Sequence, residues 1–336
     1  MKAIQFLKNS SEAGSAIEVE VETPSPRGYD LLVRIEAVGL NPVDTKVRPK
    51  DGDAPKVLGF DAAGVVVRCG DQASLFKEGD LVYFAGDVTR PGANAEFQLV
   101  DERIVAKRPS SLDAAGSAAL PLTALTAWES LFHRLRIDAD DVAGNRGRTL
   151  LIIGGAGGVG SLAIQLAKRA GLTVIATASR PESSEWCRQL GADHIINHHG
   201  NMPAQLRELG YENVSYIANF NNIDKTWSAM GEMIAPQGGV VLITGHEAAL
   251  DMGGDFKVKS VTICWEFMFT RAMFKTNDII RQHEILTRVA ELVDEGVLKA
   301  TGNDRLSPIS AENILEGHRR IESGKTIGKL TVSGWE

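Results

Sequence analysis

Cysteine is scarce in this chain of 336 residues, and long apolar runs are lacking. The three cysteines, Cys69, Cys187 and Cys264, lie far apart, without the spacing of a disulfide framework or a metal knuckle, which favours a reducing compartment. No stretch approaches the roughly 18 consecutive apolar residues of a membrane-spanning helix, and the N-terminal segment lacks the apolar core of a signal peptide. We therefore expect a soluble, cytoplasmic protein.

An excess of basic residues is also lacking. Lys and Arg number 36 against 43 Asp and Glu, a formal net charge of −7, which argues against partners such as nucleic acid or an anionic membrane. Hydrophobic residues make up 43% of the chain and charged residues 24%, as in a folded globular protein. The length exceeds what one hydrophobic core usually holds, so two domains are expected.

The pattern of predicted elements changes along the chain. The first third consists of short segments rich in Val, Ile and aromatic residues, separated by turns, which predicts β-strands. Residues 111–135 have helical spacing, with Ser111 or Asp113 as a cap. From Thr149 onward, strands and helices alternate, which predicts an α/β fold with a doubly wound parallel sheet. A last strand is expected over Gly328–Val332.

A glycine-rich loop is the strongest motif. Gly155, Gly157 and Gly160 fit G-x-G-x-x-G directly after the apolar strand Thr149–Ile153 and directly before a predicted helix. In such a loop Gly155 permits a sharp turn, Gly157 lets the backbone approach a pyrophosphate, and Gly160 allows close packing. The N–H groups at the helix start, at Gly158, Val159 and Gly160, would face the phosphates. This motif predicts a dinucleotide site.

The end of the next strand indicates which dinucleotide is bound. NAD sites usually carry an acidic residue there to accept hydrogen bonds from the ribose, whereas this chain has Ser179 and Arg180 and no acid before Glu182. A hydroxyl and a guanidinium suit a 2′-phosphate, so NADP(H) is favoured. Alternatively, Arg180 is a solvated loop residue and Ser179 caps the helix that starts at Pro181.

Several longer motifs carry a resemblance to a known family. In order along the chain these are GLNPVDTKVR (Gly39–Arg48), VLGFDAAGVV (Val57–Val66), FKEGDLVYFAG (Phe76–Gly86), GANAEFQLV (Gly92–Val100) and AALPLTALTAWESL (Ala118–Leu131). Together with the glycine loop they resemble the medium-chain dehydrogenase/reductase superfamily, in its quinone oxidoreductase branch and its "zinc-type alcohol dehydrogenase-like" subgroup. The resemblance implies a GroES-like β-rich catalytic domain from residues 1–121 and 269–336 and a Rossmann NADP(H)-binding domain from residues 122–268, with the active site between them.

The resemblance also allows the zinc ligands to be checked. Zinc-dependent relatives carry Cys at the position of Asn41 and Gly-His-Glu at the position of Gly59-Phe60-Asp61, and Phe60 has no ligand atom. Asp44 and Asp61 alone do not make a zinc site. We therefore expect no zinc. A reaction without this Lewis acid would be hydride transfer from NADPH to an electron-poor small molecule, a quinone or an α,β-unsaturated carbonyl compound.

By the same resemblance, individual residues receive roles. Asn41 and Asp44 would lie near the nicotinamide riboside and the acceptor. Tyr83 or Phe84 would line the acceptor pocket, with a weaker case for Tyr83 as proton donor. The nicotinamide end of the cofactor would be approached by Thr126, Thr244, Gly245, Phe267 and Met268, and Lys329 resembles a lysine on the cofactor side. Each has a structural alternative, such as core packing for Phe267 and Met268, a turn for Asp44 and a solvated charge for Lys329.

Two other functions stay open, a zinc-type alcohol dehydrogenase and a non-catalytic NADPH-binding protein that acts as a redox sensor or a structural protein. The segment Val258–Ile263 alternates like the edge strand of a sheet. In the family such an edge pairs with its twin, so a homodimer is expected.

Overall fold

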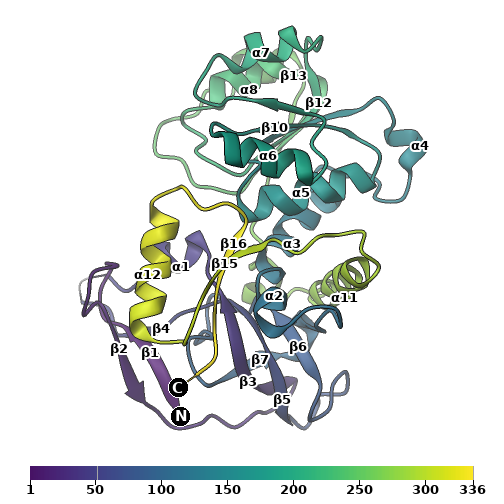
Figure 1. The fold of residues 1–336 in the computed structure, drawn as a ribbon. Helices are drawn as coiled ribbons and strands as arrows, with labels where there is room; N and C mark the ends of the chain where they lie inside the picture. The colour runs from purple at the N-terminus through teal and green to yellow at the C-terminus, as the bar shows by residue number, and fades with distance from the viewer. Residues whose placement is uncertain (51, 336) are drawn as a thin grey trace. The chain divides into compact units, whose positions relative to one another are not determined.

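The computed structural model describes residues 1–50 and 52–335, which form two compact units. Unit 1 consists of Met1–Leu125 and Met268–Glu336, and unit 2 of Thr126–Phe267. Both ends of the chain thus belong to unit 1, and the middle of the chain makes unit 2 (Figure 1). In the part of the chain that is described, no helix combines the length and the apolar character needed to cross a membrane.

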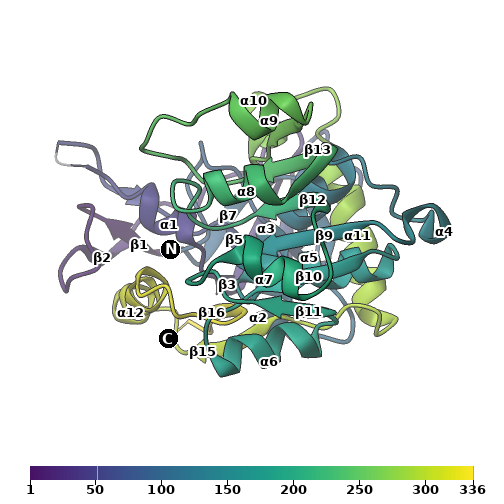
Figure 2. The same ribbon diagram turned by 90° about the horizontal axis from the view of Figure 1, so that it is seen from above.

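Unit 2 is built around a six-stranded parallel sheet. Its strands are β9 (Thr149–Ile153), β10 (Thr173–Thr177), β11 (His194–Ile196), β12 (Val214–Asn219), β13 (Ile234–Leu242) and β14 (Thr262–Trp265). They lie in the order β11-β10-β9-β12-β13-β14, and all their pairings are parallel, as predicted from the alternating elements. Figure 2 shows this order from β11 to β13. This is the order of a dinucleotide-binding Rossmann sheet, with its switch point between β9 and β12.

The central strands of this sheet carry apolar runs, and the first of them along the chain, β9, is buried throughout. Every residue of β9 is buried, and so are the inward residues of α5 (Gly158–Arg169), which follows it. The other crossover helices are α6 (Pro181–Gln189), α7 (Met202–Glu208) and α8 (Trp227–Met233). Burial on both faces explains why these strands show continuous apolar runs rather than alternation.

The expected edge strand over Val258–Ile263 is wrong in its position. Val258 instead ends a short helix, α9 (Gly254–Val258), and is exposed. The edge strand β14 begins at Thr262 and pairs with β13 through Val240 and Ile263. The alternation that suggested a strand therefore spans a helix end, a turn and only the first two residues of the strand.

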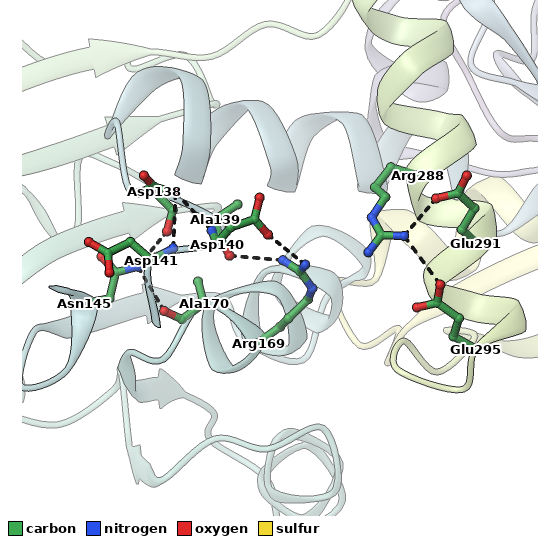
Figure 3. Close-up of polar contacts among 10 residues, drawn as sticks. All are labelled: Asp138, Ala139, Asp140, Asp141, Asn145, Arg169, Ala170, Arg288, Glu291 and Glu295. Atoms are coloured by element: carbon green, nitrogen blue, oxygen red, sulfur yellow. Dashed lines mark hydrogen bonds and ion pairs between the residues drawn. The ribbon is translucent and has the colours of Figure 1, made fainter. Parts of the chain in front are cut away.

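The segment before β9 is held to the C-terminal end of α5 (Figure 3). The side-chain amide of Asn145 donates to the carbonyl oxygens of Asp138 (2.6 Å) and Ala170 (2.9 Å). Arg169 donates to the carbonyl of Ala139 and pairs with Asp140. These bonds fix both ends of the strand–loop–helix unit that carries the glycine motif.

Unit 1 is rich in β-strands. A seven-stranded sheet contains β3 (Asp30–Gly39), β5 (Asp61–Cys69), β6 (Leu81–Phe84), β7 (Phe97–Asp101), β8 (Val105–Lys107), β15 (Gly302–Leu306) and β16 (Lys329–Ser333). A smaller sheet contains β1 (Lys2–Phe6), β2 (Ala16–Glu20) and β4 (Lys56–Val57). The returning last strand, β16, was expected from the sequence and pairs antiparallel with β3, so both ends of the chain share one apolar core.

The helical segment expected over residues 111–135 is divided. It forms α2 (Ala114–Ala118), α3 (Pro121–Trp128) and a π-helical turn, Glu129–Arg134. Of the two candidate caps, Asp113 is the one used, and its carboxylate accepts from the backbone N–H of Gly116 at 2.7 Å. Pro121 explains the break, because proline ends one helix and suits the first turn of the next.

The substitution Asn145→Ala tests the anchoring of the segment before β9. Asn145 is 2% exposed, and its loss leaves the buried carbonyl of Ala170 without its donor, so the free energy of unfolding should fall by about 1–3 kcal/mol. Urea unfolding at constant slope measures this loss. Asp140→Asn is the matched control, because the Asp140 side chain is 82% exposed and its ion pair should contribute less than about 1 kcal/mol. Equal losses for both variants would contradict the interpretation.

Candidate functional site

The glycine loop in unit 2 runs from the end of β9 to the start of α5. Gly154 has a φ of +90°, a left-handed conformation that favours glycine, and it makes the sharp turn. The sequence interpretation gave this task to Gly155, which lies in the same turn, whereas the left-handed residue is Gly154. The loop is fastened to the end of β10, where the Thr177 hydroxyl oxygen accepts from Gly154 N–H (3.0 Å) and the Thr177 carbonyl accepts from Gly155 N–H (3.2 Å).

The room for a Cβ atom differs among the three motif glycines. A Cβ on Gly155 would lie 2.8 Å from Ala176 Cβ, and a Cβ on Gly160 would lie 2.3 Å from the carbonyl oxygen of Gly154. The close packing expected at Gly160 is therefore confirmed. Gly157 differs, because the nearest atom to its hypothetical Cβ is 3.6 Å away. Packing within the chain would therefore allow a side chain at residue 157. A glycine at this position fits the expectation that another molecule approaches there.

The start of α5 offers an anion site of the expected kind. Gly157 is the N-cap, and the N–H groups of Gly158, Val159 and Gly160 lie in the first turn, where no intrahelical acceptor exists. These groups and the helix dipole favour a phosphate. The helix start is also held in place, since the Trp186 indole N–H donates to the Ser161 hydroxyl at 2.8 Å. These residues fit a dinucleotide pyrophosphate.

Ser179 and Arg180 follow β10 at the same edge of the sheet as the glycine loop, and both are partly exposed. The N-cap of α6 is Arg180 rather than Ser179, which corrects the alternative interpretation of Ser179. The hydroxyl of Ser183 bonds the backbone N–H and carbonyl of Arg180, at 3.1 and 2.9 Å. The backbone of Arg180 is therefore fixed at the place where a 2′-phosphate would be recognised.

The residues assigned to the nicotinamide end of the cofactor lie in different surroundings. Thr244 and Gly245 follow β13, and the Thr244 hydroxyl donates to the carbonyl of Asn221, next to Gly154. A Cβ on Gly245 would meet nothing within 4 Å. Thr126 in α3 and Met268 are buried, whereas Phe267 is 46% exposed. The roles of these residues stay predictions.

Unit 1 contains a buried polar network built on Asn41. The network joins the end of β3, the short helix α1 (Pro42–Lys46), the first residue of β5 and the first residue of β16. The Asn41 amide donates to Asp61 Oδ2 at 2.9 Å, and Lys329 Nζ donates to Asn41 Oδ1 at 2.6 Å and to Asp61 Oδ2 at 2.8 Å. All three side chains are at least nine-tenths buried. Lys329 is therefore not the solvated charge of the alternative interpretation.

The remaining bonds of the network are made with the backbone. Asp61 Oδ1 accepts from Leu122 N–H at 2.6 Å, and Lys329 Nζ donates to the carbonyl of Leu40 at 2.9 Å. Asp44 Oδ2 accepts from the backbone N–H of Asn41 at 2.6 Å. The packing leaves little freedom at the end of β3, since a Cβ on Gly39 would lie 2.2 Å from the carbonyl oxygen of Ala118.

Asp44 is the exception in this network. Its Oδ1 is buried, and no hydrogen-bond partner for it lies within residues 1–50 and 52–335. Burial raises the pKa of Asp44 to about 7, while the Asn41 N–H and the charge of Lys329 act in the opposite direction and the charge of Asp61 adds to the rise. Asp44 is thus a carboxyl group whose proton is exchangeable near neutral pH.

Tyr83 does not fit its predicted role. It lies in β6 with no exposed surface, and its hydroxyl donates to the carbonyl of Leu286 at 2.6 Å. Burial raises the pKa of Tyr83 well above its usual value, so the hydroxyl keeps its proton. Its placement argues against both the acceptor-lining role and the proton-donor role, because Tyr83 is a core residue that ties β6 to α11 (Arg281–Asp294).

A surface cavity of about 320 Å³ in unit 1 contains none of the predicted site residues. Its charged side chains are largely paired, Arg90 with Asp30 at 2.8 Å and Arg103 with Asp101 at 2.6 Å. This cavity is therefore separate from the residues that the sequence assigns to a site.

Comparisons with known proteins agree with this arrangement. Residues 27–110 match the alcohol dehydrogenase GroES-like domain, and residues 158–282 match the zinc-binding dehydrogenase family. The chain is 41% identical to a zinc-type alcohol dehydrogenase-like protein of Staphylococcus aureus (strain MSSA476), covering 99% of this chain and 100% of the relative. The fold and its glycine loop thus define an NAD(P)-dependent oxidoreductase of the medium-chain dehydrogenase/reductase superfamily. Within that superfamily, the chain belongs to the zinc-type alcohol dehydrogenase-like proteins.

More distant relatives carry more specific names. A 2-methylene-furan-3-one reductase of Solanum lycopersicum is 30% identical over 99% of this chain and 79% of its own length. A chloroplastic quinone-oxidoreductase homolog of Spinacia oleracea is 30% identical over 99% of this chain and 98% of its own length.

Two solved structures share the fold. A protein from Rhizobium etli CFN 42, provisionally assigned as a zinc-dependent alcohol dehydrogenase, has a TM-score of 0.93 and 45% identity over 100% of this chain and 98% of its own. The Escherichia coli quinone oxidoreductase complexed with NADPH has a TM-score of 0.83 and 22% identity over 99% and 100% of the two chains. At 22% identity, the similarity to the Escherichia coli protein shows a shared fold and nothing more specific.

The family description implies zinc, so we tested whether the residues present suit that ion. Zinc prefers thiolate and imidazole ligands, whereas the network offers an amide, a carboxylate and a backbone carbonyl. These three oxygens already accept from the ammonium of Lys329. Phe60, next to Asp61, is buried against Phe269. Among residues 1–50 and 52–335, no group of three or more His, Cys, Asp or Glu side chains is arranged to hold a metal. The donor set does not fit zinc.

Sequence reasoning missed two residues that shape the site. Thr177 holds the glycine loop, and its position at the end of a strand opposite the motif would have been the signal. Asp61 was considered only as a metal ligand, whereas it is the partner of Lys329, which is 268 residues away in the chain. No local pattern connects residues at that separation.

Replacing Asp44 with Asn should change how stability depends on pH. The folded-state pKa of Asp44 is about 7 and its ordinary value is 3.8, so the folded state holds a proton that the unfolded state releases. The stability from this proton is complete below pH 3.8 and is lost as pH rises through 7. From pH 5 to pH 8, wild type should lose about 3 kcal/mol relative to Asp44→Asn, since each pH unit between 5 and 7 removes roughly 1.4 kcal/mol. Urea unfolding of both proteins at several pH values measures the difference, and parallel pH profiles would contradict the raised pKa.

Proposed function

We propose that this protein is an NADPH-dependent reductase that transfers hydride to quinones or α,β-unsaturated carbonyl compounds without a zinc ion. One observation carries the proposal: the oxygens at the Asn41 network accept from the Lys329 ammonium. Without a Lewis acid to polarise an alcohol or a simple carbonyl, the acceptor must be electron-poor by itself. Two relatives, named as a 2-methylene-furan-3-one reductase and a chloroplastic quinone-oxidoreductase homolog, support this acceptor class.

The choice of NADPH rests on the end of β10. Bound NADPH would supply the hydride, and the chain's task is to hold and orient it. The first turn of α5 would bind the pyrophosphate, while Ser179 and the guanidinium of Arg180 would bind the 2′-phosphate. Residues 178–181, at this strand end, include no acidic side chain that would repel that phosphate, and the first acid, Glu182, is the second residue of α6.

At the reacting end, Asn41 and Asp44 remain the proposed catalytic residues. The Asn41 amide is held in one orientation, because its oxygen accepts from Lys329 and its nitrogen donates to Asp61. Asp44 carries an exchangeable proton near neutral pH and an oxygen without a partner among the described residues. In the proposal, Asp44 supplies the proton that the reduced acceptor takes up, while Thr126, Thr244, Gly245, Phe267 and Met268 bind the nicotinamide end.

A homodimer is part of the proposal. β14 lies at the end of the parallel sheet and pairs on one side with β13, and Trp265 at its end is 49% exposed. An open edge with an exposed aromatic side chain is suited to pairing with a second copy.

The activity itself is tested by following NADPH oxidation with 9,10-phenanthrenequinone, an enone and a simple alcohol–aldehyde pair. The protein should reduce the quinone and the enone after treatment with a chelator. It should be inactive on the simple aldehyde with NADPH and on the corresponding alcohol with NADP⁺. Arg180→Ala should weaken NADPH binding by about 10–100-fold and leave NADH binding nearly unchanged. Activity that is lost with the metal would indicate the zinc-dependent alternative, and binding without turnover would indicate a non-catalytic NADPH-binding protein.

Two glycine substitutions separate packing from cofactor binding. In Gly160→Ala the new Cβ would clash with the Gly154 carbonyl, so both the melting temperature and NADPH binding should fall. In Gly157→Ala the new Cβ meets only ordinary contacts, and stability should change by about 1 kcal/mol or less. NADPH binding should still weaken by at least about tenfold, because the methyl group stands where the pyrophosphate approaches. Thermal unfolding and NADPH fluorescence titration measure both effects, and unchanged NADPH binding in Gly157→Ala would contradict the proposed site.

A further inference from the structure

The ammonium of Lys329 has a complete set of acceptors. Its three N–H donors are matched by three oxygens, at 2.9 Å from Leu40 O, 2.6 Å from Asn41 Oδ1 and 2.8 Å from Asp61 Oδ2. The Lys329 side chain is 4% exposed, and that of Asp61 is fully buried. A buried ammonium is retained only when it is paired and fully hydrogen-bonded, and both conditions are met here.

The three oxygens have the character of a cation site. A carboxylate, a side-chain amide oxygen and a backbone carbonyl are the ligands by which proteins hold hard cations such as Mg²⁺, Ca²⁺ and Mn²⁺. Any metal ion bound by these oxygens would have to occupy the position of the ammonium. The ammonium and a metal ion cannot both occupy this buried position, because two positive charges in close contact repel each other strongly in a poorly solvated interior. The lysine therefore competes directly with a metal ion.

The pairing of the strands explains why the Lys329 ammonium fills this position. Lys329 is the first residue of β16, which pairs with β3, so its side chain is delivered to the end of β3 by the sheet itself. Asp61 is the first residue of β5 and pairs with Gly39. The backbone geometry thus brings a positive and a negative side chain together, with Asn41 between them.

We propose that Lys329 is the resident cation of this site: its ammonium excludes a divalent ion and holds Asn41 and Asp61 in place, as a metal ion would. Lys329 is a positioning residue in this view. The inference deepens the proposed function, on which it rests for its relevance to catalysis. Its tests measure metal binding and the state of the ammonium, so a failure of the reductase activity and a failure of this inference can be told apart.

The first experiment compares metal-free wild type with Lys329→Met, which keeps most of the side-chain volume and removes the charge. Mn²⁺ binding is followed by electron paramagnetic resonance and Zn²⁺ binding by calorimetry. Wild type should bind neither ion at this site. Lys329→Met should bind one Mn²⁺ per chain, because the three oxygens suit a hard cation better than zinc, and the second substitution Asp61→Asn should abolish that binding. Lys107→Met is the matched control, because the Lys107 side chain is 65% exposed, and it should behave like wild type.

Two results would overturn the inference. One is a stoichiometric divalent ion in wild type that is lost in Asp61→Asn, and the other is a folded Lys329→Met that gains no ion.

A second measurement uses the wild-type protein and does not depend on the folding of the variant. A buried ammonium with three acceptors exchanges its protons slowly, so Lys329 should give a resolved ammonium signal in a ¹H–¹⁵N correlation spectrum of lysine side chains. The signal is assigned by its loss in Lys329→Arg, which retains the charge. It should not change when Zn²⁺ or Mg²⁺ is added. A signal that disappears or shifts at one equivalent of either ion, or the lack of a protected signal, would contradict the inference.

Discussion

Segments that are distant in the sequence meet at the ammonium of Lys329. The end of β3 supplies a backbone carbonyl and Asn41, β5 supplies Asp61, and β16 supplies the lysine itself. Leu122, at the start of α3, donates to the other oxygen of Asp61. Since an unpaired charge in a buried site costs several kcal/mol, these segments are constrained to come together in one arrangement. The position of Asn41 and Asp44, and so the polar character of the candidate site, follows from that constraint.

Unit 2 is organised on a different principle. The glycine loop is local: one strand, one turn and one helix place the N–H groups at the start of α5, and Thr177 on the neighbouring strand holds the turn. The loop offers partial positive charge from the backbone rather than from a side chain, and it suits a phosphate. The protein therefore combines a buried, charged network in unit 1 with a backbone anion site in unit 2. The first favours an acceptor that needs no metal, and the second favours a dinucleotide.

Local patterns were sufficient for much of the fold. The strand β9 and the start of α5 lie where the sequence predicts them, because apolar runs, helix periodicity and glycine all act over a few residues. Other features depend on the tertiary structure. The segment Val258–Ile263 alternates like a strand, yet Val258 ends a helix. In the glycine loop, Gly154 rather than Gly155 takes the left-handed conformation. The short strand β15 has the polar sequence GNDRL, so its pairing with β16, rather than its own residues, defines it.

The candidate site shows the same division. Its glycines and the pair Ser179–Arg180 could be named from motif and spacing alone. The burial of Tyr83 could not, because its partner is a backbone carbonyl in a helix 203 residues away. The bond between Lys329 and Asp61 had no local signal either. It shows that the two side chains form a buried ion pair, whereas the sequence suggested a solvated lysine and a carboxylate considered only as a metal ligand.

The most direct test of this view is crystallographic. Crystals of the wild-type protein grown or soaked with Zn²⁺ and measured on both sides of the zinc absorption edge would show any ordered zinc as an anomalous peak. The structure predicts no peak within coordination distance of Asp61, and ordinary side-chain density that connects Lys329 to Asn41 and Asp61. An anomalous peak bonded to Asp61, with Lys329 turned away from it, would contradict the account.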